Sequence, residues 1–188
     1  MSQKLNKIEI RKKIRKIREN LDQKEWEEKS LKIQEKFLSS KFYKNSKVIF
    51  TYSHFDREVK TDIIIKKSLD DGKIICLPYI DWQNRVMIPS EIKKFEEIVK
   101  IKGIPCPKFL KPVNNENIDI VIVPGVAFDI YKNRIGMGGG FYDRYLKNLS
   151  KKIIKIALSF EFQILNIILP IEENDIKVDL IITEERII

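Results

Sequence analysis

The densest group of residues able to do chemistry in this chain runs from Asn133 to Tyr145. Four of the seven glycines lie there, at Gly136 and Gly138 to Gly140. Glycine backbone permits positive φ angles and lets a ligand approach the amide groups closely. Arg134 precedes the glycines and good helix formers follow Asp143, so unpaired amide groups at a helix start would face an anion. The stretch therefore predicts a phosphate-binding loop rather than a plain surface turn.

Two well-known nucleotide motifs do not fit this loop. A dinucleotide fingerprint reads G-x-G-x-x-G directly after a strand, but here Phe141 occupies the third glycine position and twelve residues separate Val123 from Gly136. A P-loop needs a glycine–lysine pair followed by Ser or Thr, and the chain has none. The loop is thus interpreted as a phosphate cradle of another kind.

Four other side chains outside the glycines are candidates for chemistry. Lys7 and Arg11 are four residues apart and share a helix face, where two cations can clamp a polyphosphate. The alternative is a solvated basic helix that touches nucleic acid or a membrane surface. Asp143 could hold Mg²⁺ against phosphate oxygens or simply complement a helix dipole. Glu58 could accept hydrogen bonds from a heterocycle, whereas Asp175 by itself indicates only a loop residue.

Composition bounds the class of protein. The 188 residues suit one domain over 1–188, and 43% apolar with 34% charged residues is typical of a soluble globular chain. No apolar run approaches the roughly 20 residues of a membrane span, and the N-terminus is too charged for a signal peptide. Cys76 and Cys106 form no zinc-type pattern, so we expect a reducing, cytoplasmic location.

The net charge of +9 is concentrated at one end of the chain. Residues 1–18 hold eight basic side chains and one acid, which leaves only about +2 for the other 170 residues. A broad nucleic-acid footprint needs basic residues spread over a face of the protein. We therefore expect no nucleic-acid partner. We also expect a monomer with no membrane partner.

Three helices are expected in the first part of the chain. The first has apolar residues mainly three and four apart, at Leu5, Ile10, Ile14, Ile17 and Leu21. Asp22 is expected to cap the second helix, with Glu25 as its capping-box partner. Thr61 is expected to cap a third helix over residues 62–71, which ends at Gly72.

Strands alternate with these helices. The expected strands are residues 48–52, 74–77 (closed by Pro78), 86–88, 118–123, 153–158 and 178–183, while residues 90–117 are ambiguous apart from a helical turn near 93–97. This order predicts an α/β fold, a three-layer α/β/α arrangement with a mostly parallel sheet and helices on both faces. Ligands of such sheets bind beyond the carboxyl ends of the strands. Residues 53–58, 126–143 and 159–163 are the candidate segments there.

The central stretch resembles the signature of the 5-formyltetrahydrofolate cyclo-ligase family. Residues 123–129 and 133–144 carry its Pro-Gly, Phe-Asp, Arg-x-Gly-x-Gly and Tyr-Asp elements. Further pieces of the resemblance are Lys7-x-x-Ile10-Arg11, Glu58-Val59-x-Thr61, Gly103-Ile104-Pro105 with Pro107, and residues 174–179. The resemblance thus extends along the whole chain.

The resemblance implies an ATP- and Mg²⁺-dependent cyclisation of 5-formyltetrahydrofolate to 5,10-methenyltetrahydrofolate. ADP and phosphate would be released, and the formyl oxygen would pass through a phosphorylated imidate. No protein nucleophile is required, which agrees with the lack of a Ser-His-Asp or Cys-His spacing; His54, the only histidine, is given no role. The alternatives are a catalytically silent folate- and nucleotide-binding protein on the same scaffold and a nucleic-acid-associated protein.

Carried over by position, the resemblance implies a role for fourteen residues. ATP would be bound by Lys7, Arg11, Arg134, Ile135, Gly136, Met137, Gly138, Gly139, Gly140, Phe141 and Tyr142. The formyl-folate would contact Glu58, Met137, Gly138, Gly139, Gly140 and Phe141. Asp143 and Asp175 would hold Mg²⁺, and Arg134 and Tyr142 would be catalytic. The chain departs from the family pattern at Lys132, Phe141 and Asn174, where glycine, tyrosine and histidine are usual.

Overall fold

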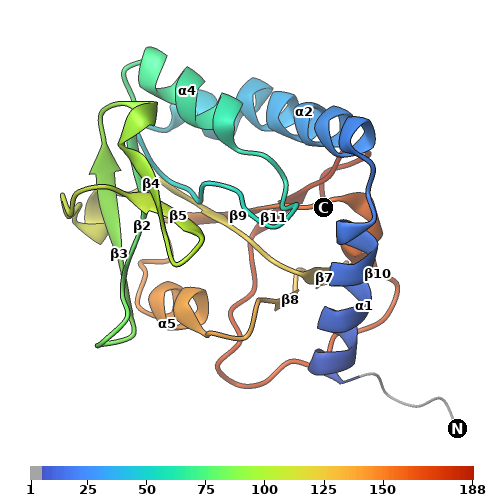
Figure 1. The fold of residues 1–188 in the computed structure, drawn as a ribbon. Coiled ribbons are helices and arrows are strands. Elements are labelled where there is room, and N and C mark those ends of the chain that lie inside the picture. Colours follow the sequence, from blue (N-terminus) through green and yellow to red (C-terminus); the bar gives the residue numbers. More distant parts are fainter. Residues whose placement is uncertain (1–5) are drawn as a thin grey trace, which may run out of the picture.

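A six-stranded sheet forms the centre of the molecule in the computed structural model, which describes residues 6–188 (Figure 1). Its strands are β1 (Val48–Phe50), β2 (Ile74–Asp81), β3 (Val86–Ile92), β6 (Ile120–Val123), β9 (Ile154–Leu158) and β11 (Leu180–Ile182). They lie in the order β11-β9-β6-β1-β2-β3, and every neighbouring pair is parallel except β2 with β3. The mostly parallel sheet predicted from the sequence is confirmed.

Helices cover both faces of this sheet. One face packs against α2 (Gln23–Ser39), α3 (Lys41–Asn45) and α4 (Asp62–Asp70), and the other against α5 (Phe141–Lys147). Strand β6 shows why: Ile120 and Ile122 belong to the core under α2 and α4, whereas Val121 and Val123 belong to the core over α5. Because alternate strand residues point to opposite faces, a continuously apolar strand needs cover on both sides. Figure 1 shows α2 and α4 above the sheet and α5 below it.

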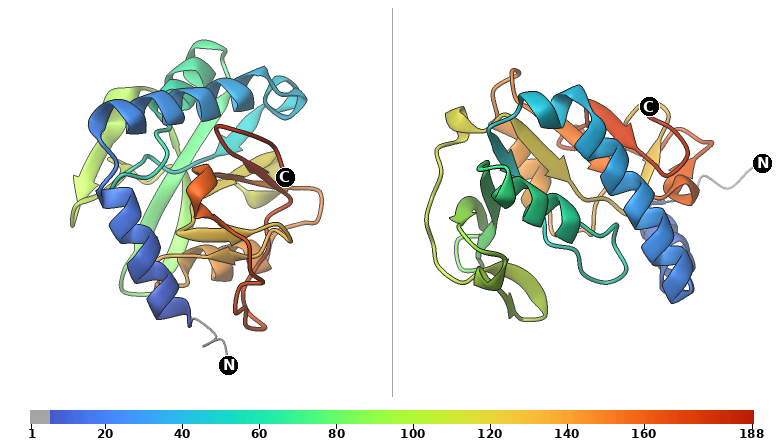
Figure 2. Two further views of the ribbon diagram at one scale, coloured as in Figure 1. Left: turned by 90° about the vertical axis from the view of Figure 1, so that its right-hand side faces the viewer. Right: turned by 90° about the horizontal axis from the view of Figure 1, so that it is seen from above.

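Helix α1 (Lys7–Glu19) packs on a second, small sheet. That sheet has the order β10-β7-β8 and contains β7 (Ala127–Asp129), β8 (Arg134–Ile135) and β10 (Ile164–Leu165). Ile10 and Ile14 are buried against Ala127 and Ile135, as their helical spacing predicts, and the predicted apolar position Leu5 lies outside the described residues. Figure 2 shows α1 and α2 meeting at a corner. No helix among residues 6–188 is long and apolar enough to cross a membrane.

A hairpin occupies part of the segment that was ambiguous in sequence. Strands β4 (Ile98–Ile101) and β5 (Ile104–Pro107) pair antiparallel around Lys102 and Gly103, which both have positive φ angles. Single-turn 3-10 helices lie at Phe95–Glu97, Asn115–Asn117 and Glu161–Gln163, the first where a helical turn was expected. The prediction that Pro78 closes β2 was wrong. Pairing with β1 stops at Cys76, so no neighbouring strand on that side needs the N–H that Pro78 lacks.

The first two helices differ in how their N-termini are capped. Asp22 accepts a hydrogen bond from the amide of Glu25, as predicted. The Glu25 side chain does not complete a capping box and instead pairs with Lys29 at 3.0 Å. A complete box is found at α1, where Asn6 and Glu9 each accept from the other's backbone amide.

Thr61 precedes α4 but does not cap it, which corrects the sequence-based interpretation. Its hydroxyl donates to the carbonyl of Tyr52 at 2.8 Å. The first amides of the helix, at Ile63 and Ile64, donate instead to the side-chain oxygen of the buried Gln34 on α2. The cap is therefore supplied by a packed neighbouring helix, which no local sequence pattern indicates.

Gly125, between β6 and β7, is expected to tolerate no side chain. A Cβ atom there would lie 2.3 Å from Cζ of the buried Phe128. We predict that Gly125→Ala lowers the free energy of unfolding by about 3 kcal/mol in urea titrations, because a close-packed core cannot absorb the atom. Gly72→Ala is the control: Gly72 has φ +71° and open space around it, so only about 1 kcal/mol of backbone strain is expected. Equal losses would contradict the packing argument.

Candidate active site

A cleft of about 1330 Å³ opens beyond the carboxyl ends of β1 and β6. Its walls come from α1, the loop after β1, the β8–α5 loop, the β2–β3 and β4–β5 hairpins and the segment around Pro170 to Asp175. All fourteen predicted site residues line it: Lys7, Arg11, Glu58, Arg134, Ile135, Gly136, Met137, Gly138, Gly139, Gly140, Phe141, Tyr142, Asp143 and Asp175. Residues far apart in the chain are thus brought to one place.

The glycine loop between β8 and α5 needs its glycines for two different reasons. Gly138 and Gly140 have φ angles of +103° and +68°, which other residues rarely adopt. A Cβ atom on Gly136 would lie 2.7 Å from Nη1 of Arg134, so this glycine lets the arginine lie against the loop backbone. Arg11 of α1 holds the loop by donating from Nε to the Gly136 carbonyl at 2.8 Å.

Arg134 is the central cation of the cleft. Its side chain is 2% exposed, and Nη2 donates to Oδ1 of Asp143 at 2.6 Å. Nη1 donates to the Pro124 carbonyl at the end of β6, and Asp143 Oδ1 also accepts the amide of Ile176. Nε is buried without a hydrogen-bond partner among residues 6–188. Because unpaired buried donors are costly, this group is a natural contact for a bound acceptor.

Lys7 lies between two carboxylates at the other edge of the cleft. Its Nζ is 2.5 Å from Oδ2 of Asp175 and 2.9 Å from Oε1 of Glu172. Burial lowers the pKa of Lys7, but the hydrogen bonds to these carboxylates outweigh it and the pKa is raised. In this arrangement Lys7, the predicted phosphate ligand, forms an ion pair with Asp175, the predicted metal ligand.

The carboxylates of the cleft fit a magnesium ion that is shared with a phosphate. Within residues 6–188 no cluster of three or more His, Cys, Asp or Glu side chains forms a complete cage. Mg²⁺ is commonly bound by one or two carboxylates, waters and substrate phosphates, so a complete cage is not required. Asp143 and Asp175 each direct their contacts to one oxygen, which leaves Oδ2 and Oδ1, respectively, without a hydrogen bond from any residue of the described part of the chain.

Glu58 is buried in the loop after β1, which also lines the cleft. It is 6% exposed, and within residues 6–188 its carboxylate accepts one hydrogen bond, from the amide of Phe55 at 3.3 Å. Burial raises the pKa of the Glu58 carboxyl to about 7, although the guanidinium of Arg18 opposes the rise. The hydroxyl of Tyr142 is buried without a partner among the described residues, and burial followed by the Glu58 charge raises its pKa. A flat ligand with N–H groups would satisfy both.

Part of the cleft is apolar and was not anticipated from sequence. Trp82, 39% exposed at the end of β2, lies edge-to-face with Phe141 at 5.6 Å between ring centroids. Met87 of β3 and Ile104 of the β4–β5 hairpin line the same region. Exposed aromatic side chains beside a cleft are common ligand contacts, but no spacing in the sequence links Trp82 to the glycine loop.

The three departures from the family pattern leave the loop intact. Lys132 has φ +66°, the left-handed conformation that glycine usually supplies, and the Asp129 carboxylate holds this turn by accepting from neighbouring amides. Phe141 packs on Trp82, and Asn174 accepts a hydrogen bond from Lys147 at 3.0 Å.

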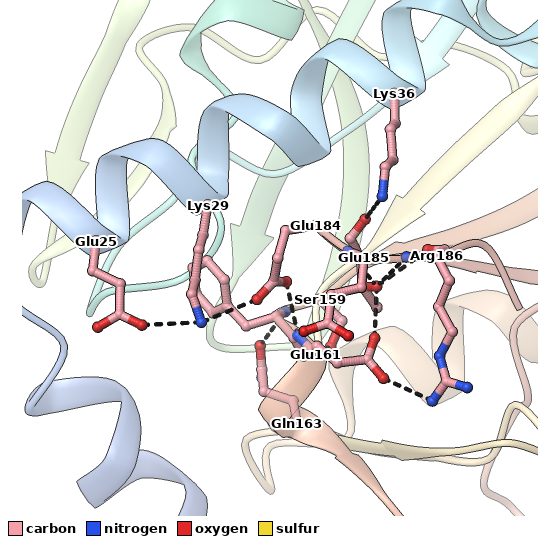
Figure 3. A network of polar contacts seen from close by, with 11 residues as sticks. Glu25, Lys29, Lys36, Ser159, Glu161, Gln163, Glu184, Glu185 and Arg186 are labelled. Carbon is pink, nitrogen blue, oxygen red and sulfur yellow. Dashed lines mark hydrogen bonds and ion pairs between the residues drawn. The ribbon is translucent and has the colours of Figure 1, made fainter.

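The third candidate segment, residues 159–163, does not line the cleft. Gln163 donates to the carbonyls of Gly125 and Val126. Glu161 pairs with Arg186 at 2.7 Å (Figure 3). The returning C-terminal residues cover the carboxyl end of β9, and Thr183 donates to Glu161. This end of the sheet is therefore filled by a structural polar network, in which Figure 3 also shows Lys29 between two glutamates.

Comparison with known proteins agrees with the resemblance seen in the sequence. The model of the 5-formyltetrahydrofolate cyclo-ligase family matches residues 3–184. The chain is 32% identical over 168 residues to 5-formyltetrahydrofolate cyclo-ligase of Mus musculus, covering 83% of this chain and 82% of the relative. It is 32% identical over 166 residues to the enzyme of that name from Haemophilus influenzae, covering 82% and 86%.

A solved structure is similar over nearly the whole fold. The NMR structure of 5,10-methenyltetrahydrofolate synthetase from Aquifex aeolicus superimposes with a TM-score of 0.85 at 32% identity. The superposition covers 96% of this chain and 91% of that one.

Proposed function

Because the chain belongs to the 5-formyltetrahydrofolate cyclo-ligase family, its substrate is a folate, and we propose that ATP and Mg²⁺ drive the ring closure. The products would be 5,10-methenyltetrahydrofolate, ADP and phosphate. The observation that carries this proposal is the pairing of two unlike ends in one cleft. The glycine loop with Arg134 suits phosphate oxygens, and the buried Glu58 suits the N–H groups of a pterin.

The formyl oxygen of the substrate is a poor leaving group until it is phosphorylated. The formyl oxygen of the substrate attacks the γ-phosphate of ATP, ADP leaves, and the oxygen becomes part of a phosphorylated imidate. N10 of the folate then attacks the activated carbon, the ring closes and phosphate departs. Such a sequence needs alignment and neutralisation of charge more than a protein nucleophile.

In this proposal each group of cleft residues has a physical task. Arg134 neutralises charge on the transferred phosphoryl group, and its unpartnered Nε is free to bond an oxygen. Lys7 and Arg11 hold the polyphosphate from the α1 side. The Tyr142 hydroxyl, which has no partner among residues 6–188, donates a hydrogen bond near the reacting formyl group. Asp143 and Asp175 hold Mg²⁺, which would neutralise phosphate charge when bound.

The ion pair between Lys7 and Asp175 would be replaced by contacts to the nucleotide and the metal when these bind. With Asp175 engaged as a metal ligand, Lys7 would be available to a phosphate oxygen. The glycine loop, held by Arg11, would supply amide groups to the same polyphosphate.

The proposed function is tested by mixing the purified protein with MgATP and 5-formyltetrahydrofolate and following the near-ultraviolet absorbance of the methenyl product. We expect a rise that requires protein, ATP and Mg²⁺ together. Tight formyl-folate binding without any rise would instead favour a catalytically silent binding protein on this scaffold. No binding of either ligand would overturn the proposal.

A further inference from the structure

One face of α1 contacts each of the three loops around the cleft. Its cations are Lys7, Arg11, Arg15 and Arg18, spaced by four, four and three residues. They contact Asp175 of the C-terminal segment, the Gly136 carbonyl of the glycine loop and, at the far end, Asp56 in the loop that carries Glu58. The first two cations belong to the proposed nucleotide site, whereas the last two have no role in it.

Arg18 is the unusual member of this row. Its side chain is 2% exposed, although arginine is seldom fully buried. Nη2 lies 3.1 Å from Oδ2 of Asp56, whose side chain is 29% exposed. Nε is buried without a hydrogen-bond partner among residues 6–188. A cation held in this way needs a compensating negative environment, and the carboxylates it faces are Asp56 and Glu58.

The loop that Arg18 contacts contains a strained turn. Asp56 and Arg57 have φ angles of 50° and 56°, a left-handed conformation that costs free energy for residues with a Cβ atom. The turn is closed by the Glu58 amide, which donates to the Phe55 carbonyl at 3.0 Å, while the Phe55 amide donates to the Glu58 carboxyl. A shift of this turn would therefore move the Glu58 carboxyl.

We propose that Arg18 is a positioning residue for folate binding: through Asp56 it holds the strained turn that presents Glu58 to the cleft. The inference rests on the proposed function of the cleft. It also makes α1 the element that ties the folate wall to the nucleotide wall, because the same helix face holds the glycine loop.

The charges around Glu58 give this proposal a distinctive signature. The groups that face it are Arg18 from α1, Asp56 from its own loop, Tyr52 after β1 and Tyr142 from α5. Burial raises the pKa of Glu58, Arg18 lowers it and Asp56 raises it. Removing Arg18 or Asp56 breaks the same ion pair but should move the pKa of Glu58 in opposite directions.

The test compares Arg18→Met, Arg18→Lys and Asp56→Asn with the wild-type protein in the methenyl assay between pH 5 and 9. Arg18→Met and Asp56→Asn should each raise KM for formyl-folate about tenfold, with KM for ATP within about twofold. The acid limb of kcat/KM for the folate should move up by about one pH unit in Arg18→Met and down in Asp56→Asn. Arg18→Lys keeps the charge and should fall between wild type and Arg18→Met.

Shifts of the acid limb in the same direction, or an equal rise in KM for ATP, would overturn the proposal, because a merely loosened structure would produce them. If Arg18→Met fails to fold, Asp56→Asn at a partly exposed position still gives the decisive downward shift. If the wild-type protein forms no methenyl product, the proposed function fails separately. The positioning role is then decided by NMR titration of the Glu58 carboxyl in the ligand-free proteins, where opposite shifts are again expected and equal ones would refute it.

Discussion

Arg134→Ala is expected to lower kcat about a thousandfold, with little effect on KM for the folate. The reason is that Arg134 supplies a buried cation beside the glycine loop, in a setting where water cannot replace it. Arginines that neutralise charge in phosphoryl transfer contribute about 10³ to 10⁵ in rate. The measurement is a steady-state assay of methenyl product in which ATP and folate are varied separately.

The structure also predicts what Arg134→Ala does to stability. Asp143 would lose its 2.6 Å ion pair but would keep the amide of Ile176 and its partial exposure of 21%. We therefore expect a folded variant whose melting temperature falls by a few degrees, rather than one that unfolds.

Arg186→Ala is the matched control for this variant. Arg186 also forms an ion pair of similar length, 2.7 Å to Glu161, but that pair lies outside the cleft. Its loss should leave kcat unchanged. Activity close to wild type in Arg134→Ala would refute the phosphate-binding role of this arginine, and an equal loss of kcat in Arg186→Ala would show that the effect is one of folding.

The two-faced sheet could be predicted because its central strands β1 and β6 are apolar at every position. Val121 and Ile122 point to opposite faces, and neither face tolerates water, so helices had to cover both. The glycine loop could also be predicted, because a group of glycines indicates backbone with positive φ angles, which Gly138 and Gly140 adopt. These are features whose physical cause lies within a few residues of each other.

The β4–β5 hairpin could not be predicted for the opposite reason. Pro105 and Pro107 indicate a broken segment, but among residues 6–188 β5 pairs with β4 on one side alone, so no strand there needs an N–H on its other side. The turn at Lys102 depends on a left-handed residue other than glycine. Because the hairpin could not be predicted, nothing in the sequence indicated that Ile104 and Trp82 would line the same cleft.

The ion pairs of the cleft were also beyond sequence reasoning. Lys7 and Asp175 are 168 residues apart and meet only because Ile10 and Ile14 seat α1 on the small sheet. Sequence patterns indicated that a cation and a carboxylate were present, but not that each would neutralise the other. The same packing brings Arg18 to the loop of Glu58, at the opposite end of the helix.

Glu58→Gln is expected to weaken catalysis and strengthen the fold at the same time. A charged hydrogen-bond acceptor for the pterin is worth about 1.5 to 3 kcal/mol, so kcat/KM for formyl-folate should fall about 10- to 100-fold near neutral pH. The pH dependence of stability has the opposite sign. Below pH 4.5 the carboxyl is protonated in both the folded and the unfolded chain, so its burial does not lower the free energy of unfolding through ionisation.

Between pH 4.5 and about 7 the unfolded chain ionises this carboxyl, whereas burial keeps it protonated in the folded protein. The wild-type free energy of unfolding should therefore fall by up to about 3 kcal/mol between pH 4.5 and 8, and Glu58→Gln should escape this fall. Urea titrations of both ligand-free proteins across this range measure the difference. The expected gap is near zero at pH 4.5 and largest at pH 8.

Glu184→Gln provides the contrast that gives this result its meaning. The Glu184 side chain is nearly as buried, at 7% exposed, but it pairs with Lys29 at 3.1 Å and lies outside the cleft. Its replacement should cost stability at neutral pH and leave activity unchanged, because the charge it removes is already compensated. If removing the Glu58 carboxyl stabilises the fold but impairs the reaction, the carboxyl serves ligand binding rather than folding. If Glu58→Gln instead lost stability at pH 8, the buried charge would be structural and the folate wall would need another acceptor.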